Sequence, residues 1–385
     1  MPNLPKYSNL IAAITTIASC DIALGFTFQL LPLLMEHQHI PARIIGLNTA
    51  MGPLGILLVG PILPHIIGRV GPKRLAYCAV AFMMTASIIF RLTPSLYVWF
   101  LLRFLFGIAI GALFTISKAW ILTFAGRGNR GRIMGIYTSV MAISFSFGPF
   151  MLPFTGIDDW LPWIIGILGL GMGSLPLAFI DVSDDLFRNE EGGNSQRAIE
   201  RAPLLQFAAR SATHFDSVFI SFFSIFRLRS GLTLQTASGV LGAGIIGSTL
   251  FQFMIGSLSD RWSRVGVVVC SAIITVTMSI PLIFVVNSWL IWSVVIILAT
   301  SAFAVYVVAL ATMGDTFKGC DLIAGSAAFS AMWGVGGLIG PPIVGAAIDR
   351  FGVDAMPVAL ASFYLILLLA LTLSGDRLIR EVQLG

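Results

Sequence analysis

The stretch WFLLRFLFGIAIGALFTISKAW, residues Trp99 to Trp120, decides the fold class. It is longer than the roughly 20 apolar residues that a helix needs to cross the hydrocarbon core of a bilayer. Arg103 and Lys118 lie inside this run, although a charge at membrane depth costs roughly 3 kcal/mol on insertion scales. Charges kept at this depth usually serve a pathway or a partner. The stretch therefore predicts a membrane-spanning helix with two functional cations; the alternative is that both side chains reach back to the membrane surface.

Two glycines give the same helix a smooth face. Arg103, Gly107 and Gly111 follow one another at four-residue intervals, which places them near one helix face. Small residues at this spacing let a second helix approach closely. Lys118 lies about 22 Å along the axis from Arg103 and about 60° around it. We therefore expect one face with a cation towards each end and a packing surface of glycine between them.

Composition extends this interpretation to the whole chain. Of its 385 residues, 57% are hydrophobic and 11% are charged, and the mean hydropathy is +0.93. Soluble domains carry about 25% charged residues, so the chain is predicted to be a polytopic membrane protein. The net charge of +5 comes from short loops, without the basic stripe or zinc spacing of nucleic-acid binding. None of the four cysteines forms a CxxC pair, so neither a metal site nor a disulfide framework is expected. We expect no cofactor.

Apolar length predicts twelve spans in two six-helix halves, an all-α membrane fold. The halves are residues 1–181 and 203–385, joined by a polar cytoplasmic linker at 182–202. The expected spans are 8–34, 44–67, 75–92, 96–124, 133–156, 160–180, 203–228, 235–258, 265–286, 288–316, 322–347 and 355–375.

Basic residues in the loops predict the orientation. Fifteen Lys and Arg residues fall on the side of the two termini and five on the other side. Cytoplasmic loops carry the excess of Lys and Arg, so we expect a multi-pass protein with both termini in the cytoplasm.

The two halves share landmarks. Asp21 and Asp216 each lie thirteen residues into the first span of their half, near mid-depth. Turns rich in Gly and Arg follow the second span of each half, at 68–74 and 256–264. Such repeats are typical of two-lobed transporters that rock about a central site.

These residues resemble the major facilitator superfamily. Gly256-x-Leu258-x-Asp260-Arg261-x-x-Arg264 resembles the loop signature of that family, and Arg103-x-x-x-Gly107-x-x-x-Gly111 is similar to its fourth-helix signature. Gly148-Pro149 resembles part of the fifth-helix signature of its antiporters. Asn129-Arg130-Gly131-Arg132, with Gly340-Pro341-Pro342, looks most like the YcaD-like bacterial permeases.

The resemblance implies secondary active transport of a small organic solute across the bacterial inner membrane by alternating access, by a monomer and without enzymatic activity. The direction stays open: Gly148-Pro149 favours export, whereas the buried cations leave uptake of a vitamin such as riboflavin, or of another aromatic metabolite, as an alternative. A polytopic membrane enzyme or a channel is the alternative of another class. The sequence shows no histidines with partners at metal-ligand spacing and no repeated filter segment.

Mid-depth polar residues are the candidates for binding solute and protons. Asp21 and Asp216 could exchange a proton or hold a cationic group; the alternative is a permanent ion pair with Arg103, Lys118 or Arg210. His214 could relay protons or simply pack near the membrane surface. The full candidate set is Asp21, Gln29, Arg103, Lys118, His214, Asp216 and Gln252.

Charged loop residues are the candidates for gating, because they can bond exposed helix ends. The alternative is a solvated loop. The set is Arg69, Asp260, Arg261 and Arg264. The residues expected to serve helix packing are Gly107, Gly111, Gly148, Pro149, Gly340 and Pro341.

Overall fold

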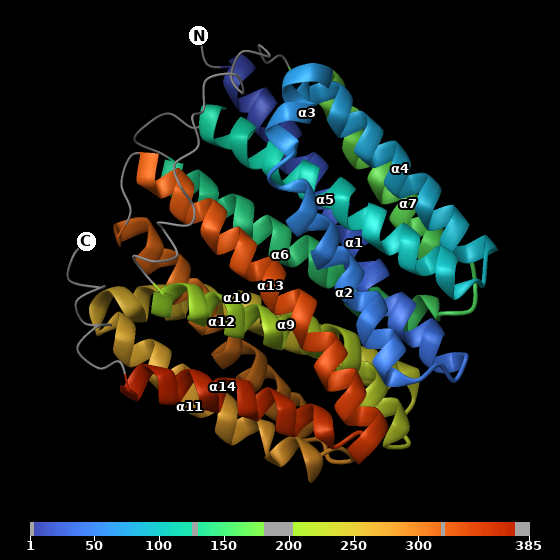
Figure 1. Cartoon of the computed structure of the whole chain (residues 1–385), viewed down its shortest axis with the longest axis vertical. Coiled ribbons are helices and arrows are strands. Elements are labelled where there is room, and N and C mark those ends of the chain that lie inside the picture. The colour runs from blue at the N-terminus through green and yellow to red at the C-terminus, as the bar shows by residue number, and fades with distance from the viewer. Residues whose placement is uncertain (1–3, 125–129, 181–202, 317–319, 374–385) are drawn as a thin grey trace. The chain divides into compact units, whose positions relative to one another are not determined.

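The computed structural model describes the whole chain except residues 1–3, 125–129, 181–202, 317–319 and 374–385 (Figure 1). Within the described residues every regular element is a helix. The α-helices are α1 Leu4–His37, α2 Ala42–Val59, α3 Leu63–Val70, α4 Pro72–Leu92, α5 Leu96–Phe124, α6 Arg130–Thr155, α7 Leu161–Ser174, α9 Pro203–Arg229, α10 Leu234–Arg261, α11 Arg264–Ser279, α12 Ile291–Thr316, α13 Cys320–Phe351 and α14 Ala355–Leu373. Two 3₁₀ segments, η1 Leu175–Phe179 and η3 Pro281–Ile283, extend α7 and α11.

The predicted fold class is confirmed, since these elements account for each of the twelve expected spans. The span expected at 44–67 is divided into α2 and α3. Pro61 and Pro64 lie at this break, and proline offers no backbone N–H to continue a helix. The predicted linker at 182–202 lies outside the described residues.

Ten helices in the described part of the chain are long and apolar enough to cross a membrane. Two expected spans fall outside this set. Within the described residues, the apolar stretch found in α6 is Ser139–Thr155. Helix α9 carries Arg210, His214 and Asp216 within its length, which lowers its hydropathy.

The helices form two compact units. The first contains residues 1–34 and 51–190, and the second contains 35–50 and 191–385. The segment 35–50, which holds the end of α1 and the start of α2, is therefore N-terminal in sequence but packs within the second unit. Each of these two helices thus contributes residues to both units.

Glycine packing between α2 and α5 shapes the first unit. A Cβ on Gly107 would collide with the backbone carbonyl of Gly52, and a Cβ on Gly55 would lie 2.9 Å from the backbone nitrogen of Ile108. Gly111 faces Ile56, whose Cα would lie 3.2 Å from an added Cβ. The two backbones are close because glycines from both helices lie at the crossing. The glycine face of α5 therefore contacts α2.

Helix α1 crosses α6 in the same way. A Cβ on Gly25 would collide with the carbonyl oxygen of Phe145, and one on Gly148 would collide with the backbone nitrogen of Phe26. Pro149, which follows, is buried. The two close crossings, α2 with α5 and α1 with α6, fix the helices that carry the candidate charges. Asp21 lies on α1, and Arg103 and Lys118 lie on α5.

Replacing Gly107 by valine is expected to destabilise the protein by about 1–3 kcal/mol, because the added atoms meet backbone that cannot rotate away. Thermal unfolding of the detergent-solubilised protein would measure the loss. Gly68→Ala is the matched control: no atom lies within 4 Å of an added Cβ there, and alanine favours helix over glycine. Equal unfolding midpoints for the two variants would contradict the close crossing.

Candidate functional site

The charged site of the first unit begins with Asp21 on α1 and Lys118 on α5. The Asp21 side chain is 2% exposed, and its Oδ2 atom has no hydrogen-bond partner among the described residues. The Asp21 carboxylate and the Lys118 ammonium interact electrostatically. Within the described part of the chain, these two groups do not form a direct ion pair. One carboxylate oxygen therefore stays available for a proton or a solute.

Arg103 lies closer to the other end of α5 and is also 2% exposed. Its Nη1 donates a hydrogen bond of 3.2 Å to the backbone carbonyl of Thr27. The guanidinium carbon lies 4.8 Å from the centre of the Phe28 ring, a cation–π contact. Its Nη2 has no hydrogen-bond partner in the described structure. Arg103 is thus a buried cation held by a carbonyl and a ring rather than by a described carboxylate.

Aromatic and hydroxyl groups accompany these charges. The Ser117 hydroxyl donates to the Phe114 carbonyl at 3.1 Å, so at 3.0 Å it accepts from the Tyr137 hydroxyl. The Phe28 ring lies edge-on to Phe145, with 6.0 Å between centroids. The predicted residue Gln29 is buried on the same helix as Asp21. The first unit therefore combines charge, hydroxyls and aromatic surface around α1, α5 and α6.

In the second unit, Asp216 of α9 interacts electrostatically with Tyr306 of α12 and Tyr364 of α14. The Tyr364 hydroxyl donates to the backbone carbonyl of Ala302 at 2.9 Å. The Oδ1 atom of Asp216 has no hydrogen-bond partner within the described residues. Asp216 thus faces two phenols, where Asp21 faces an ammonium group.

His214 has different neighbours from Asp216, although only two residues separate them. Its ring is 3% exposed and lies against Phe363 of α14. A Cβ on Gly340 of α13 would lie 2.8 Å from the imidazole Nδ1. The Arg210 guanidinium, one helical turn earlier in α9, interacts electrostatically with the imidazole. This close packing favours the packed-histidine alternative over a proton relay.

The remaining predicted residues are placed as follows. Gln252 of α10 is half-buried, Arg69 and Arg261 are exposed, and Arg264 opens α11. The Asp260 side chain lies outside the described ones, so its predicted gating role stays a prediction. A cation that the sequence analysis did not assign does bond a helix end. Lys73 donates to the carbonyls of Ala178 and Ile180, at 2.8 Å and 3.0 Å, where η1 ends.

Sequence reasoning also missed buried amides. Asn48 of α2 and Gln206 of α9 are almost fully buried. Neither amide has a hydrogen-bond partner among the described residues. A single polar residue in an apolar run is the signal that would have found both. No group of three or more His, Cys, Asp or Glu side chains in the described structure is placed to hold a metal ion.

Comparison with known proteins gives the family. The profile of the Major Facilitator Superfamily matches residues 11–230 and 207–381. The MFS-type transporter YfkF of Bacillus subtilis (strain 168) is 27% identical over 246 residues, which are 62% of this chain and 63% of YfkF. The MFS-type transporter YcaD of Escherichia coli O139:H28 is 21% identical over 355 residues, 91% of each chain. The predicted resemblance is therefore confirmed.

Solved structures show the same fold. The nucleoside transporter NupG is 11% identical and superposes with a TM-score of 0.76 over 96% of this chain and 98% of NupG. A bacterial homologue of the human lysosomal transporter Spinster is 15% identical, with a TM-score of 0.72 over 99% of this chain and 96% of its own. With twelve spans, a family profile matching both halves and these shared folds, the chain belongs to the Major Facilitator Superfamily of transporters.

Proposed function

We propose that this chain is a proton-coupled secondary transporter that moves a small organic solute across the inner membrane by alternating access. The proposal rests on the carboxylate of Asp21, which is buried and has one oxygen without a hydrogen-bond partner. This carboxylate interacts electrostatically with Lys118 of α5 in the same unit. Coupling needs a group whose protonation changes during the cycle. A buried carboxylate carries its charge only at a cost, so a change in its surroundings changes its proton occupancy.

The charges of the first unit also indicate the class of solute. Arg103 and Lys118 together carry two positive charges, against one negative charge on Asp21. A buried cation without a counter-charge is costly, and an anionic or carbonyl-rich group on the solute would satisfy it. The free Nη2 of Arg103 is a donor for such a group. Phe28, already stacked under the guanidinium, adds surface for an aromatic part of the solute.

Export is the direction we propose, from the resemblance of Gly148-Pro149 to part of the antiporter signature. Uptake of an aromatic vitamin such as riboflavin is the second candidate, because it suits a site with both aromatic and cationic groups. Export predicts a lower solute concentration inside the cell, whereas uptake predicts a higher one.

The proposal is tested by comparing small molecules inside cells and in their medium, with and without the protein. Cells that express Asp21→Asn serve as the inactive control. A solute depleted inside and raised in the medium only with the wild type supports export, and a solute enriched inside supports uptake. Identical profiles in all three strains, with the protein present in the membrane, would contradict transport of any solute in the medium tested.

A further inference from the structure

Three helices of the second unit meet around Asp216, because α9 packs against both α12 and α14. The Phe215 ring of α9 lies edge-on to the Tyr364 ring of α14, with 6.0 Å between centroids. The Tyr364 hydroxyl reaches the carbonyl of Ala302 on α12, one helical turn before Tyr306. Asp216 interacts electrostatically with both phenols. We call the junction of Asp216, Tyr306 and Tyr364 the phenol site.

The phenol site holds hydrogen-bond acceptors that the protein leaves without a donor. A tyrosine hydroxyl has one proton to donate, and Tyr364 donates it to the Ala302 carbonyl at 2.9 Å. Tyr364 therefore has no proton left for the Asp216 carboxylate. The Oδ1 atom of Asp216 has no hydrogen-bond partner among the described residues. The phenol site thus presents a carboxylate oxygen and a phenol oxygen that can only accept.

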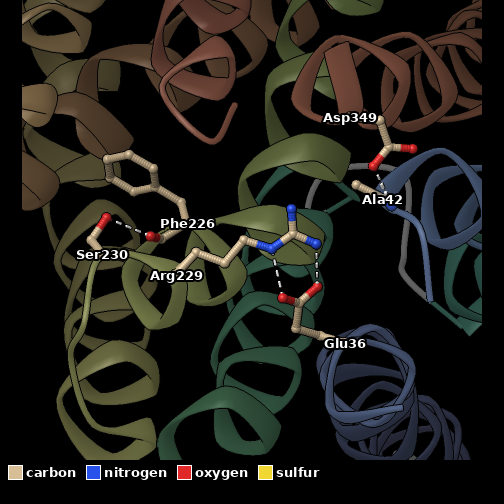
Figure 2. A network of polar contacts seen from close by, with 6 residues as sticks. All are labelled: Glu36, Ala42, Phe226, Arg229, Ser230 and Asp349. Atoms are coloured by element: carbon tan, nitrogen blue, oxygen red, sulfur yellow. Dashed lines mark hydrogen bonds and ion pairs between the residues drawn. The ribbon is translucent and has the colours of Figure 1, made fainter. Parts of the chain in front are cut away.

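Two other carboxylates of the second unit do have partners. Both oxygens of Glu36 accept from the Arg229 guanidinium, at 2.6 Å and 2.7 Å (Figure 2). The Asp349 carboxylate accepts from the backbone N–H of Ala42 at 2.8 Å (Figure 2). In contrast, no described basic side chain forms an ion pair with Asp216. A carboxylate without donor or counter-charge is costly in apolar surroundings, so a ligand that supplies both would be bound there.

Aromatic rings form one wall of the phenol site, and its other side is accessible. The Phe215 ring stacks on Phe219 one turn further along α9, with 5.1 Å between centroids. These two rings and Tyr364 are buried. The side chains of Asp216 and Tyr306 are only half-buried. A ligand can therefore reach the carboxylate while its apolar part lies against rings.

From these contacts we infer that the phenol site binds a protonated organic amine. An ammonium group carries a positive charge, has three donors and has no acceptor, which complements a site made of acceptors. It donates a charge-assisted hydrogen bond to the Asp216 carboxylate and a second bond to the Tyr364 oxygen. The faces of the tyrosine rings also attract a cation. The amine is expected to carry an apolar or aromatic group, because the wall beside it is aromatic.

A metal cation suits the phenol site less well. Hard cations such as Ca²⁺ and Mg²⁺ take six or more oxygen ligands. One carboxylate and two phenols offer fewer. In the part of the chain that the structure describes, no cluster of three or more His, Cys, Asp or Glu side chains could hold a metal ion. The site therefore favours an organic cation, which needs only a few acceptors and an apolar wall.

Equilibrium binding tests this inference without a gradient or a transport assay. Radiolabelled benzylamine, which is protonated at neutral pH, is titrated onto the detergent-purified protein. Benzyl alcohol has nearly the same shape without the charge and is the matched competitor. We expect saturable binding at millimolar concentrations or below, and no displacement by benzyl alcohol. Asp216→Asn is expected to weaken binding about tenfold or more, the loss of one charge-assisted hydrogen bond.

Two tyrosine variants provide a second measurement if Asp216→Asn does not fold. Tyr306→Phe keeps the ring but removes one oxygen of the phenol site, and it is expected to weaken benzylamine binding several-fold. Tyr97→Phe makes the same change at a residue that is 90% exposed. It is expected to leave the affinity unchanged. Unfolding temperatures of the ligand-free variants show whether each one is folded.

Several results would overturn the amine site. These are the absence of saturable benzylamine binding, equal binding of benzyl alcohol, and unchanged affinity in Asp216→Asn and Tyr306→Phe. Displacement of benzylamine by NaCl but not by the same concentration of KCl would assign the phenol site to sodium instead. Binding lost in Asp21→Asn but kept in Asp216→Asn would place the amine in the first unit.

The amine site and the proposed transport can fail separately. The binding assay involves no movement of solute and no pH gradient, whereas the test of coupling through Asp21 requires both. Loss of one result therefore leaves the other standing.

Discussion

Replacing Asp21 by asparagine is expected to abolish the dependence of solute accumulation on a pH gradient. One pH unit corresponds to about 1.4 kcal/mol per proton, or about tenfold accumulation if one proton moves with each solute molecule. Asparagine has nearly the same shape as aspartate but cannot bind and release a proton. The tenfold ratio should therefore fall to about one in Asp21→Asn. Proteoliposomes with an imposed pH gradient, loaded with the solute identified in cells, would measure this ratio.

Two further variants locate the coupling group. Asp354→Asn, an exposed carboxylate far from either candidate in sequence, should keep the full ratio. Asp216→Asn tests the second unit, where the carboxylate faces Tyr306 and Tyr364 instead of an ammonium group. A loss confined to Asp216→Asn would move coupling to that unit. Unchanged ratios in both Asp21→Asn and Asp216→Asn would reject proton coupling through either group.

Replacing Arg103 by alanine is expected to weaken the apparent affinity for the solute about 100-fold. Truncating one partner of a buried charged contact costs about 2–5 kcal/mol, and each 1.4 kcal/mol is tenfold in affinity. Arg103→Lys should recover only part of the loss, because an ammonium group cannot both stack flat on Phe28 and bond the Thr27 carbonyl as the guanidinium does. The concentration dependence of transport separates an effect on affinity from one on maximal rate.

A structural role for Arg103 predicts a different outcome. If its purpose were to hold α5 against α1, Arg103→Ala would lower the unfolding temperature as strongly as it lowers transport. A solute-binding role predicts a large effect on affinity and a small one on unfolding. Lys118→Ala extends the test to the second cation. Wild-type affinity in both alanine variants would reject recognition of the solute by α5.

The fold was predictable because the bilayer imposes a length on every span. A run of about 20 apolar residues identifies a crossing helix without knowledge of its neighbours. The same reasoning placed Arg103, Gly107 and Gly111 on one face, and the two glycines of that face meet α2 in the structure. It failed to anticipate the break between α2 and α3, where Pro61 and Pro64 divide one expected span.

Contacts between distant segments were not predictable in this way. Lys118 could be named from the sequence as a partner for Asp21, but so could Arg103 and Arg210, because nothing in the pattern fixes how helices rotate against one another. Glu36 lies 193 residues from Arg229, and Ala42 lies 307 residues from Asp349. Arg229 and Arg350 are both among the five basic residues that the sequence places on the side away from the termini. Only the fold shows that Arg229 is paired with a carboxylate, whereas Arg350 lies over the Phe351 ring.

The placement of residues 35–50 in the second unit bears on how the protein can be divided into fragments. A fragment that begins at residue 203 has every helix of the C-terminal half, yet it lacks the segment that covers Arg229 and the backbone at Gly345. Expressed alone, this fragment would expose Arg229 without its carboxylate partner and the backbone of α13 at Gly345 without α2 against it. We expect such a surface to aggregate. Co-expression with a fragment that includes residues 35–50 would supply the missing cover. Complementation in trans would then depend on two short helix ends from the N-terminal half.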